Sequence, residues 1–245
     1  MPPIDASNGT EAGAAAPQLA DSVEDTLDLR IPDELLALFR EGEPDADPEQ
    51  ADGCAGDLLD HLAEWGPATT SHGSFQLVPV RIERDLVLIS RWMNDPAVAA
   101  FWELAGPDSV TAAHLRTQLD GDGRSLPCLG VLEGVPMSYF EIYRADLDPL
   151  ARHYPARPHD TGLHLLVGGV ADRGRGVGST LLRAVADLIF DKRPRCTRVI
   201  AEPDLRNTPS VSAFLSGGFR YSAEIDLPRK RAALMVRDRA LRNLL

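Results

Sequence analysis

From residue 75 onward, apolar residues follow two different spacings along the chain. Short apolar or alternating runs, typical of strands, occur at 75–80, 127–134, 136–143, 162–170, 197–203, 219–227 and 231–238. Helical spacing occurs at 85–93, 110–119, 176–190 and 208–216, with a further helix expected after the turn at 94–96. This order predicts an α/β fold of the α+β type, with a mixed central sheet flanked by helices rather than a purely parallel sheet.

Residues 1–74 differ from the rest of the chain in composition and charge. They hold 17 Asp or Glu and two Arg, a net charge of −15, whereas residues 75–245 carry +3, which together give −12. We therefore expect an acidic N-terminal extension over 1–74, partly disordered with short helices at 33–40 and 57–65. A single folded domain is expected over 75–245. The charge argues against nucleic acid as a partner, while the weakly basic second part suits a small anionic ligand.

The three cysteines, Cys54, Cys128 and Cys196, are far apart and form no CxxC or Cys/His spacing. This pattern argues against a disulfide scaffold and against a zinc site, and we expect no metal. It favours a reducing cytoplasm. No apolar run reaches about 18 residues and the first 20 residues do not resemble a signal peptide, so no membrane partner is expected. Oligomeric state is left open.

The densest glycine cluster lies at a predicted strand-to-helix junction. It reads Arg173-Gly174-Arg175-Gly176-Val177-Gly178. Glycine permits positive φ and close approach of a ligand, and the free amides and dipole of the following helix favour an anion such as pyrophosphate. The spacing excludes a nucleoside triphosphate P-loop. The alternative is a glycine-rich connection that only turns the chain.

This cluster resembles the acyl-CoA loop of the GNAT acyltransferase superfamily, and the downstream pattern Arg206, Asn207, Ser210, Gly218, Phe219 is similar too. The resemblance covers about residues 75–239. Short strings in matching order resemble more closely the siderophore-biosynthesis branch, which includes mycobactin lysine N-acyltransferases and aerobactin-type N6-hydroxylysine acetyltransferases. These strings are 92–94, 102–103, 125–127, 137–143, 162–166, 194–196 and 202–207.

The resemblance implies a GNAT fold, an acyl-CoA co-substrate and the roles of individual residues. Acyl-CoA binding is implied for Val167, Gly168, Gly169, Val170, Arg173, Gly174, Arg175, Gly176, Val177, Gly178 and Asn207. His164 is implied in the acceptor pocket. Asp204 matches the residue that is proposed as the proton acceptor in the mycobactin lysine N-acyltransferases.

The chemistry permits either residue to act as the base. A lysine-like amine has a pKa near 10.4 and must lose a proton before it attacks a thioester. A histidine with a pKa near 6.5 is competent at neutral pH. If the acceptor is a less basic N-hydroxyamine, a carboxylate suffices and His164 can orient the hydroxyl. The alternatives are a helix cap for Asp204 and a satisfied core histidine for His164, which shares a strand face with Leu166.

Four further residues are weaker candidates for the acceptor site. Tyr139, Glu141 and Tyr143 alternate along one strand and share one face, which either lines the acceptor site or faces solvent. Trp102 is placed to cover the acceptor. The other histidines, among them His114, lack a partner pattern and are assigned to the surface or to loops. Cys128 and Cys196 are expected to be buried and inert, so no covalent acyl-enzyme is proposed.

The leading hypothesis is therefore acyl transfer from acyl-CoA, in a ternary complex, to a side-chain amine or N-hydroxyamine. The small-molecule acceptor would be a lysine-, ornithine- or diamine-type building block of a hydroxamate siderophore. One alternative is an aminoglycoside 6'-N-acetyltransferase, whose polycationic substrate usually meets an acidic cleft. The other is a non-catalytic acyl-CoA-binding module.

Overall fold

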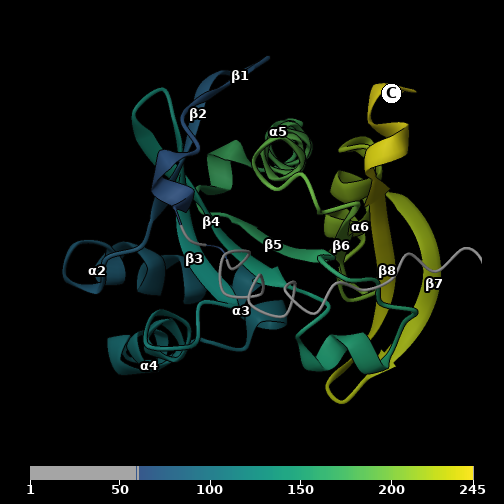
Figure 1. The fold of residues 1–245 in the computed structure, drawn as a ribbon. Helices are drawn as coiled ribbons and strands as arrows, with labels where there is room; N and C mark the ends of the chain where they lie inside the picture. The colour runs from purple at the N-terminus through teal and green to yellow at the C-terminus, as the bar shows by residue number, and fades with distance from the viewer. Residues whose placement is uncertain (1–58, 60, 245) are drawn as a thin grey trace, which may run out of the picture. The chain divides into compact units, whose positions relative to one another are not determined.

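The computed structural model describes residue 59 and residues 61–244. Eight strands form a single sheet, which lies at the centre of the ribbon in Figure 1. The strand order is β1-β2-β3-β4-β5-β6-β8-β7, and every neighbouring pair is antiparallel except β5 and β6. The strands are β1 (Ala68–Thr70), β2 (Gly73–Pro79), β3 (Ser125–Leu132), β4 (Val135–Arg144), β5 (Thr161–Val167), β6 (Arg198–Ala201), β7 (Arg220–Leu227) and β8 (Lys230–Asp238). The predicted mixed sheet is confirmed.

Five α-helices occur in the described part of the chain. They are α2 (Ile82–Met93), α3 (Pro96–Trp102), α4 (Asp108–Leu119), α5 (Val177–Lys192) and α6 (Thr208–Ser216). Within 61–244, no helix has the length and apolar character needed to cross a membrane.

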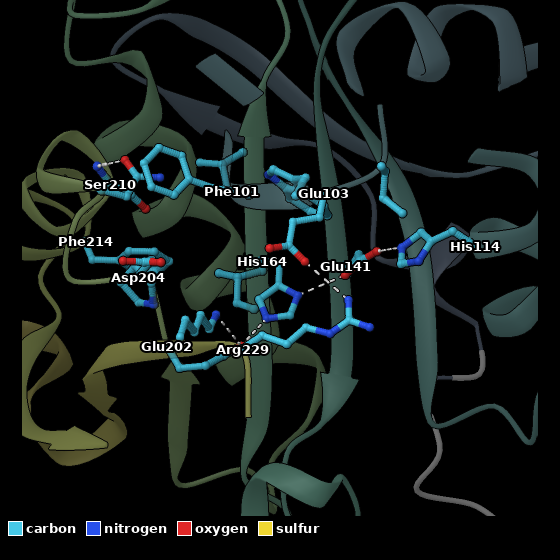
Figure 2. Close-up of a pocket in the computed structure, with 17 residues that line it drawn as sticks. Phe101, Glu103, His114, Glu141, His164, Glu202, Asp204, Ser210, Phe214 and Arg229 are labelled. Atoms are coloured by element: carbon cyan, nitrogen blue, oxygen red, sulfur yellow. Dashed lines mark hydrogen bonds and ion pairs between the residues drawn. The ribbon is translucent and has the colours of Figure 1, made fainter. Parts of the chain in front are cut away.

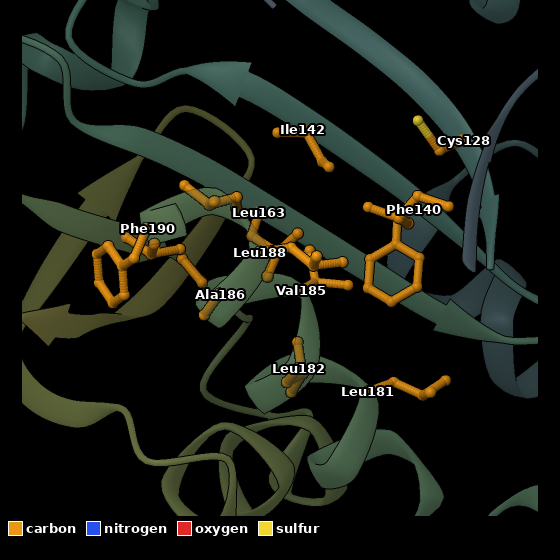
Figure 3. Close-up of a cluster of buried hydrophobic side chains, with 14 of the residues drawn as sticks. Cys128, Phe140, Ile142, Leu163, Leu181, Leu182, Val185, Ala186, Leu188 and Phe190 are labelled. Atoms are coloured by element: carbon orange, nitrogen blue, oxygen red, sulfur yellow. The ribbon is translucent and has the colours of Figure 1, made fainter. Parts of the chain in front are cut away.

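The alternation of side chains along the strands separates two cores on opposite faces of the sheet. Phe140 and Leu163 pack with the apolar stripe of α5, as Figure 3 shows. Tyr139 and Leu166, their opposite-facing neighbours, pack with α2, α3 and α4. Because successive strand residues point to opposite faces, each central strand supplies both cores. His164 therefore lies on the α2–α4 face with Leu166, as the sequence predicts.

The parallel pair β5 and β6 is joined over a very short length. Only Thr161 with Val199 and Gly162 with Ile200 are in register. Beyond Ala201 the chain follows β8 instead, since Ala233 N–H donates to Pro203 O at 2.9 Å and Asp204 forms a bridge with Ala232. The two strands consequently diverge, and the gap lies at the centre of the sheet.

Most predicted elements are present, with shifted ends. The helix at 208–216 is confirmed at both ends, whereas the runs 162–170 and 197–203 end as strands at Val167 and Ala201. Helix α2 begins at Ile82, three residues earlier than predicted, because the Asp85 carboxylate accepts the Arg81 N–H at 2.8 Å.

The N-terminal side of the boundary expected at residue 75 is only partly described. The predicted helix at 33–40 lies outside the described residues. Of the helix predicted at 57–65, the structure describes the short 3-10 helix η3 (Leu62–Glu64). Leu59, Leu62 and Trp65 are buried in the α5 core, and β1 pairs with β2. Leu59, Leu62 and Trp65 thus contribute to the core, and β1 contributes to the sheet.

Candidate active site

The divergence of β5 and β6 opens a pocket of about 310 Å³. Leu163 to Leu165 on β5 form one wall, and Glu202 to Asp204 after β6 form another. Figure 2 shows the side chains that meet there. The other lining residues are Phe101, Trp102, Glu103, Leu104, His114, Glu141, Asn207, Ser210, Phe214, Arg229 and Lys230. Five of the residues singled out in the sequence therefore share one cavity: Trp102, Glu141, His164, Asp204 and Asn207.

His164 lies between two buried carboxylates (Figure 2). Its Nδ1 is 2.9 Å from Oε2 of Glu141, and its Nε2 is 2.5 Å from Oε1 of Glu202. The antiparallel register places Glu141 on β4 directly opposite His164 on β5, while Glu202 immediately follows β6. Three adjacent strands thus bring together one imidazole and two acidic groups. The importance of Glu202 was missed in the sequence, although it stands in the matched string 202–207.

Helix α4 supplies further donors to Glu141. Oε1 of Glu141 lies 2.5 Å from Nε2 of His114 and accepts hydrogen bonds from Gln118 Nε2 at 2.7 Å and Tyr139 OH at 3.0 Å. The surface assignment of His114 is wrong, because its ring is only 30% exposed and points at Glu141. The available signal was the spacing of His114 and Gln118, four residues apart and therefore on one helix face.

The charges of this network depend on one another. Burial alone lowers the pKa of His164, but the charge of Glu202 and hydrogen bonds to both carboxylates raise it to about 10. Burial raises the pKa of Glu141 and Glu202, but the imidazolium of His164 and other donors hold both below the ordinary glutamate value. At neutral pH this raised pKa favours the imidazolium form of His164, whose two N–H groups would both point at carboxylates.

The aromatic residues predicted at the acceptor site surround this network. Tyr139 is fully buried, so the solvent-facing alternative for its strand face is wrong. Trp102 packs edge-on against Tyr139 and His164, with ring centroids 5.5 and 6.1 Å apart. Tyr143 OH donates to Oε2 of Glu202 at 2.8 Å. Trp102 and Glu141 line the pocket, whereas Tyr139 lies beneath it and supports Glu141.

A glycine on β5 makes room for Tyr143. A Cβ on Gly162 would lie 2.0 Å from Cζ of the Tyr143 ring, far inside van der Waals contact. The absence of a side chain at Gly162 therefore lets the ring cross β5 and reach Glu202.

Asp204 lies in the same pocket but belongs to a different set of contacts. Its carboxylate accepts from the backbone N–H of Arg206 at 2.8 Å and from the Arg206 guanidinium at 2.7 Å. These hydrogen bonds hold the pKa of Asp204 below its ordinary value. Asp204 does not cap α6, because that position is taken by Asn207, whose Oδ1 accepts the Ser210 N–H at 3.2 Å. Asp204 is thus an ionised group with its side chain buried at the wall of the pocket.

The glycine cluster forms the start of α5. Gly174 and Gly176 adopt φ values of +72° and +80°, and a Cβ at either position would meet no atom within 4 Å. Gly176 is the N-cap of α5 and supplies no side chain to its first amides. The exposed side chain of Arg175 makes no hydrogen bond or ion pair within the described chain. Unfilled amides, open space and a cation satisfy the requirements of an anion site.

Arg173 has a different task from Arg175. Its guanidinium donates to the carbonyl oxygens of Val167 and Gly168, each at 2.9 Å, and pairs with Asp95 at 3.0 Å. Arg173 therefore ties the C-terminal end of β5 to the glycine cluster. The remaining predicted residues of this stretch, Gly169 and Val170, lie where the chain enters a short 3-10 turn, η5 (Val170–Asp172).

No group of His, Cys, Asp and Glu within the described residues has an arrangement suited to a metal ion. Cys128 and Cys196 are buried free thiols, as predicted, and burial raises the pKa of both. Neither lines the pocket.

Comparison with known proteins identifies the family. The sequence profile of the acetyltransferase (GNAT) domain matches residues 81–227, more than half of the chain. The chain belongs to the GNAT acetyltransferase family. The resemblance noted in the glycine cluster and in the segment around Asn207 is therefore confirmed, and the protein is an acyltransferase.

Relatives of this GNAT protein include enzymes with named acceptors. A lysine N-acyltransferase (MbtK) of Mycolicibacterium paratuberculosis is 38% identical over 154 residues, which span 63% of this chain and 69% of the relative. The N(6)-hydroxylysine O-acetyltransferase of Escherichia coli is 37% identical over 155 residues, spanning 63% of this chain and 49% of the relative. A hydroxyornithine transacylase of Ajellomyces capsulatus is 35% identical over 153 residues, spanning 62% of this chain and 35% of the relative. These matches confirm the resemblance to the siderophore-biosynthesis branch of the GNAT family.

Solved structures agree with the GNAT fold. An uncharacterised protein from Bacillus halodurans has a TM-score of 0.68 and 30% identity, covering 74% of this chain and 94% of its own. The aminoglycoside acetyltransferase AAC(6')-Ib in complex with coenzyme A and kanamycin has a TM-score of 0.61 and 23% identity, covering 68% of this chain and 95% of its own. The second likeness concerns the fold alone.

Proposed function

We propose that this GNAT protein transfers the acyl group of an acyl-CoA to the side-chain nitrogen of a lysine-, ornithine- or diamine-type building block of a hydroxamate siderophore. The observation that carries the proposal is the pocket between β5 and β6, where Asp204 and the His164 network line one cavity. The lysine, N6-hydroxylysine and hydroxyornithine named for the relatives share a terminal nitrogen on a short aliphatic stem. An amphipathic pocket walled by carboxylates suits such an acceptor.

Acyl-CoA would lie along the gap between the diverging strands. The first amides of α5 and the Arg175 side chain face open space and would hold its pyrophosphate. Asn207 and Ser210 line the pocket on the α6 side, where the pantetheine arm would pass. When bound, acyl-CoA supplies the thioester carbon that the acceptor nitrogen attacks.

Asp204 is our choice for the residue that takes the proton from the acceptor nitrogen. The raised pKa of His164 favours the imidazolium at neutral pH, and an imidazolium with both nitrogens facing carboxylates has no lone pair to offer. Asp204 is ionised, lines the pocket and has a lowered pKa. A weak base of this kind suits an N-hydroxyamine better than the far more basic alkylamine, which favours a hydroxamate product.

His164 then acts as a positioning residue. Its cation holds Glu141 and Glu202 at fixed positions on either side of the pocket. These two carboxylates line the cavity together with Lys230, whose Nζ lies 3.5 Å from Oε1 of Glu202, and they would pair with a cationic group of the acceptor in competition with that lysine. Trp102 would cover the acceptor stem, since its ring packs against both His164 and Tyr139.

The acceptor is thus a small molecule, and we propose no nucleic-acid or membrane partner. A cytoplasmic location is part of the same proposal, because the two cysteines of the described chain are unpaired thiols.

A thiol-release assay with purified full-length protein tests the function. It combines acetyl-, succinyl-, malonyl- and long-chain acyl-CoA with lysine, ornithine, their side-chain N-hydroxy forms, cadaverine derivatives and kanamycin. The proposal predicts turnover with an N-hydroxyamine and a drop in kcat of about 100-fold or more in Asp204→Asn, the usual size of a lost acid–base group.

Two outcomes contradict the proposal. Turnover with kanamycin alone would move the protein to aminoglycoside acetylation. Binding of acyl-CoA without turnover of any acceptor would favour a non-catalytic binding module.

A further inference from the structure

A second pocket, of about 340 Å³, adjoins the first. The two cavities share four lining residues, namely His114, Glu141, His164 and Glu202. The second pocket lies between the C-terminal turn of α4 and the first residue of β3. Its other lining residues are Thr117, Gln118, Gly121, Asp122, Arg124, Ser125, Tyr143 and Asp148. The imidazole and its two carboxylates therefore form a partition with a cavity on each side.

The two cavities differ in chemistry. The first is lined by Phe101, Leu104, Leu165 and Phe214 in addition to its polar groups. The second has no aliphatic side chain and, apart from one glycine, is lined only by polar, charged and aromatic-hydroxyl groups. Side chains of these types offer charges and hydrogen-bond donors and acceptors to a polar ligand.

One carboxylate and one guanidinium that line the second pocket have polar atoms without a hydrogen-bond partner in the described chain. Asp148 is half-buried and uses Oδ1 to accept the Leu150 N–H at 2.8 Å, while its Oδ2 makes no hydrogen bond within the described chain. Arg124 forms an ion pair from Nε to Oδ2 of Asp122 at 2.9 Å, and its two terminal amino groups have no partner within the described residues. A free carboxylate oxygen and a free guanidinium edge are the complements of an ammonium and a carboxylate.

We propose that the second pocket binds the α-amino acid end of the acceptor, with Asp148 pairing the α-ammonium and Arg124 pairing the α-carboxylate. The side chain of the acceptor would then extend past His164, where the two pockets share their lining, and present its nitrogen in the first pocket, beside Asp204. This inference rests on the proposed function and narrows it, because it selects a free α-amino acid over a decarboxylated diamine.

Equilibrium binding to the full-length protein saturated with CoA tests the inference separately from turnover. The probes are L-lysine and L-ornithine, and for each the α-amide, the Nα-acetyl form and the decarboxylated diamine. The variants are Arg124→Gln and Asp148→Asn, the second of which keeps the capping oxygen for Leu150. The matched control is Arg116→Gln, an exposed arginine of α4 that lines neither pocket.

Each variant has its own expected pattern. Arg124→Gln should weaken binding of the free amino acid by about 10- to 100-fold, the loss of one charge-assisted pair, and leave the amide and the diamine unchanged. Asp148→Asn should weaken the amino acid, the amide and the diamine, and leave the Nα-acetyl form unchanged. Arg116→Gln should change none of them.

Equal effects on all probes, no effect in either variant, or no binding of lysine or ornithine to the wild type would overturn the inference. The proposed function fails differently. If the binding pattern appears but no acyl-CoA is consumed with any acceptor, the α-amino acid subsite stands and acyl transfer does not. If an amine is acylated but the binding pattern is absent, acyl transfer stands and the subsite does not.

Discussion

At the scale of single residues, the ring of His164 determines the charge state of the site. Both ring nitrogens face carboxylates, and these carboxylates raise the pKa of His164 well above that of an ordinary histidine. The sequence suggested His164 as a possible neutral base, because one histidine in a strand carries no information about its partners. Glu141 and Glu202 come from different strands, and only the fold brings them to its two nitrogens.

The first prediction concerns stability and pH, with His164→Gln as the variant. The folded-state pKa of His164 is raised from 6.5 to about 10, so its stabilisation is full below pH 6.5 and is lost as pH rises toward 10. The folded-state pKa of Glu202 is lowered from 4.5 to about 2, so its stabilisation is full above pH 4.5 and is lost as pH falls toward 2.

The difference in the free energy of unfolding between wild type and His164→Gln should therefore be largest between about pH 4.5 and 6.5. It should shrink at pH 9 and above. Urea unfolding of both proteins across this range measures it. A difference that grows steadily with pH would contradict the charged network.

The second prediction separates Asp204 from its partner Arg206. Arg206 is 75% exposed and lowers the pKa of Asp204 by hydrogen bonding. In Arg206→Gln the pKa of Asp204 should rise, so activity that needs the carboxylate should be lost at a higher pH as the solution is acidified. The acid limb of kcat/KM against pH measures the shift. An unmoved acid limb, together with normal kcat in Asp204→Asn, would remove Asp204 from the proton transfer.

At the scale of elements, the gap between β5 and β6 creates the site. Pro203 and Asp204 pair with β8 rather than with β5. This pairing places Glu202 and Asp204 on the wall of the first pocket. Gly162 is the last β5 residue in register with β6, and it is also where the Tyr143 ring crosses. The same position thus ends the parallel pairing and opens the route from Tyr143 to Glu202.

A third prediction tests this crossing with Gly162→Ala and Tyr143→Phe. The added methyl would overlap the Tyr143 ring, so Gly162→Ala should lower the free energy of unfolding by about 1–3 kcal/mol, as overpacking does. Tyr143→Phe keeps the ring and removes only the hydroxyl that donates to Glu202. Both variants should lower kcat. Full activity and stability in Gly162→Ala would show that the ring does not need this space.

A fourth prediction concerns the two ends of α5. Arg175 precedes the helix N-terminus and Arg195 follows its C-terminus, and both side chains are exposed. Arg175→Gln should weaken CoA binding by about 10-fold, because it removes one phosphate contact. CoA binding by this variant should also depend less on salt concentration than binding by the wild type. Arg195→Gln should leave CoA binding unchanged. Calorimetric titration of CoA at two salt concentrations measures both, and equal effects of the two substitutions would contradict a phosphate site at Gly174–Gly178.

The sequence predicts elements better than it predicts contacts. Helix α6 and the β3–β4 hairpin follow from local periodicity and turn residues, and both occur where expected. The pairing of Glu141 with His164 depends on the β4–β5 register, which local spacing does not specify. His114 was assigned to the surface because its partner lies 27 positions further along the chain, on a different element. Contacts between distant elements, rather than the elements themselves, determine this site.

At the scale of the whole molecule, the described chain combines one sheet, three clusters of buried hydrophobic residues and two adjoining pockets. The α5 core supports the proposed acyl-CoA side, and the helices α2 to α4 enclose the proposed acceptor side. The His164 network lies where the two pockets meet. This arrangement explains how a single domain of the GNAT family would hold two substrates and bring their reacting atoms together.

The central claim is that an acyl group moves from CoA to the side-chain nitrogen of an amino acid acceptor. The most direct measurement is tandem mass spectrometry of the product formed by the full-length protein from acetyl-CoA and N6-hydroxylysine or N5-hydroxyornithine. We expect one added acetyl group, located on the side-chain nitrogen as a hydroxamate, and almost no product with Asp204→Asn. Acetylation of the α-amine, or consumption of acetyl-CoA without an acylated amino acid, would contradict it.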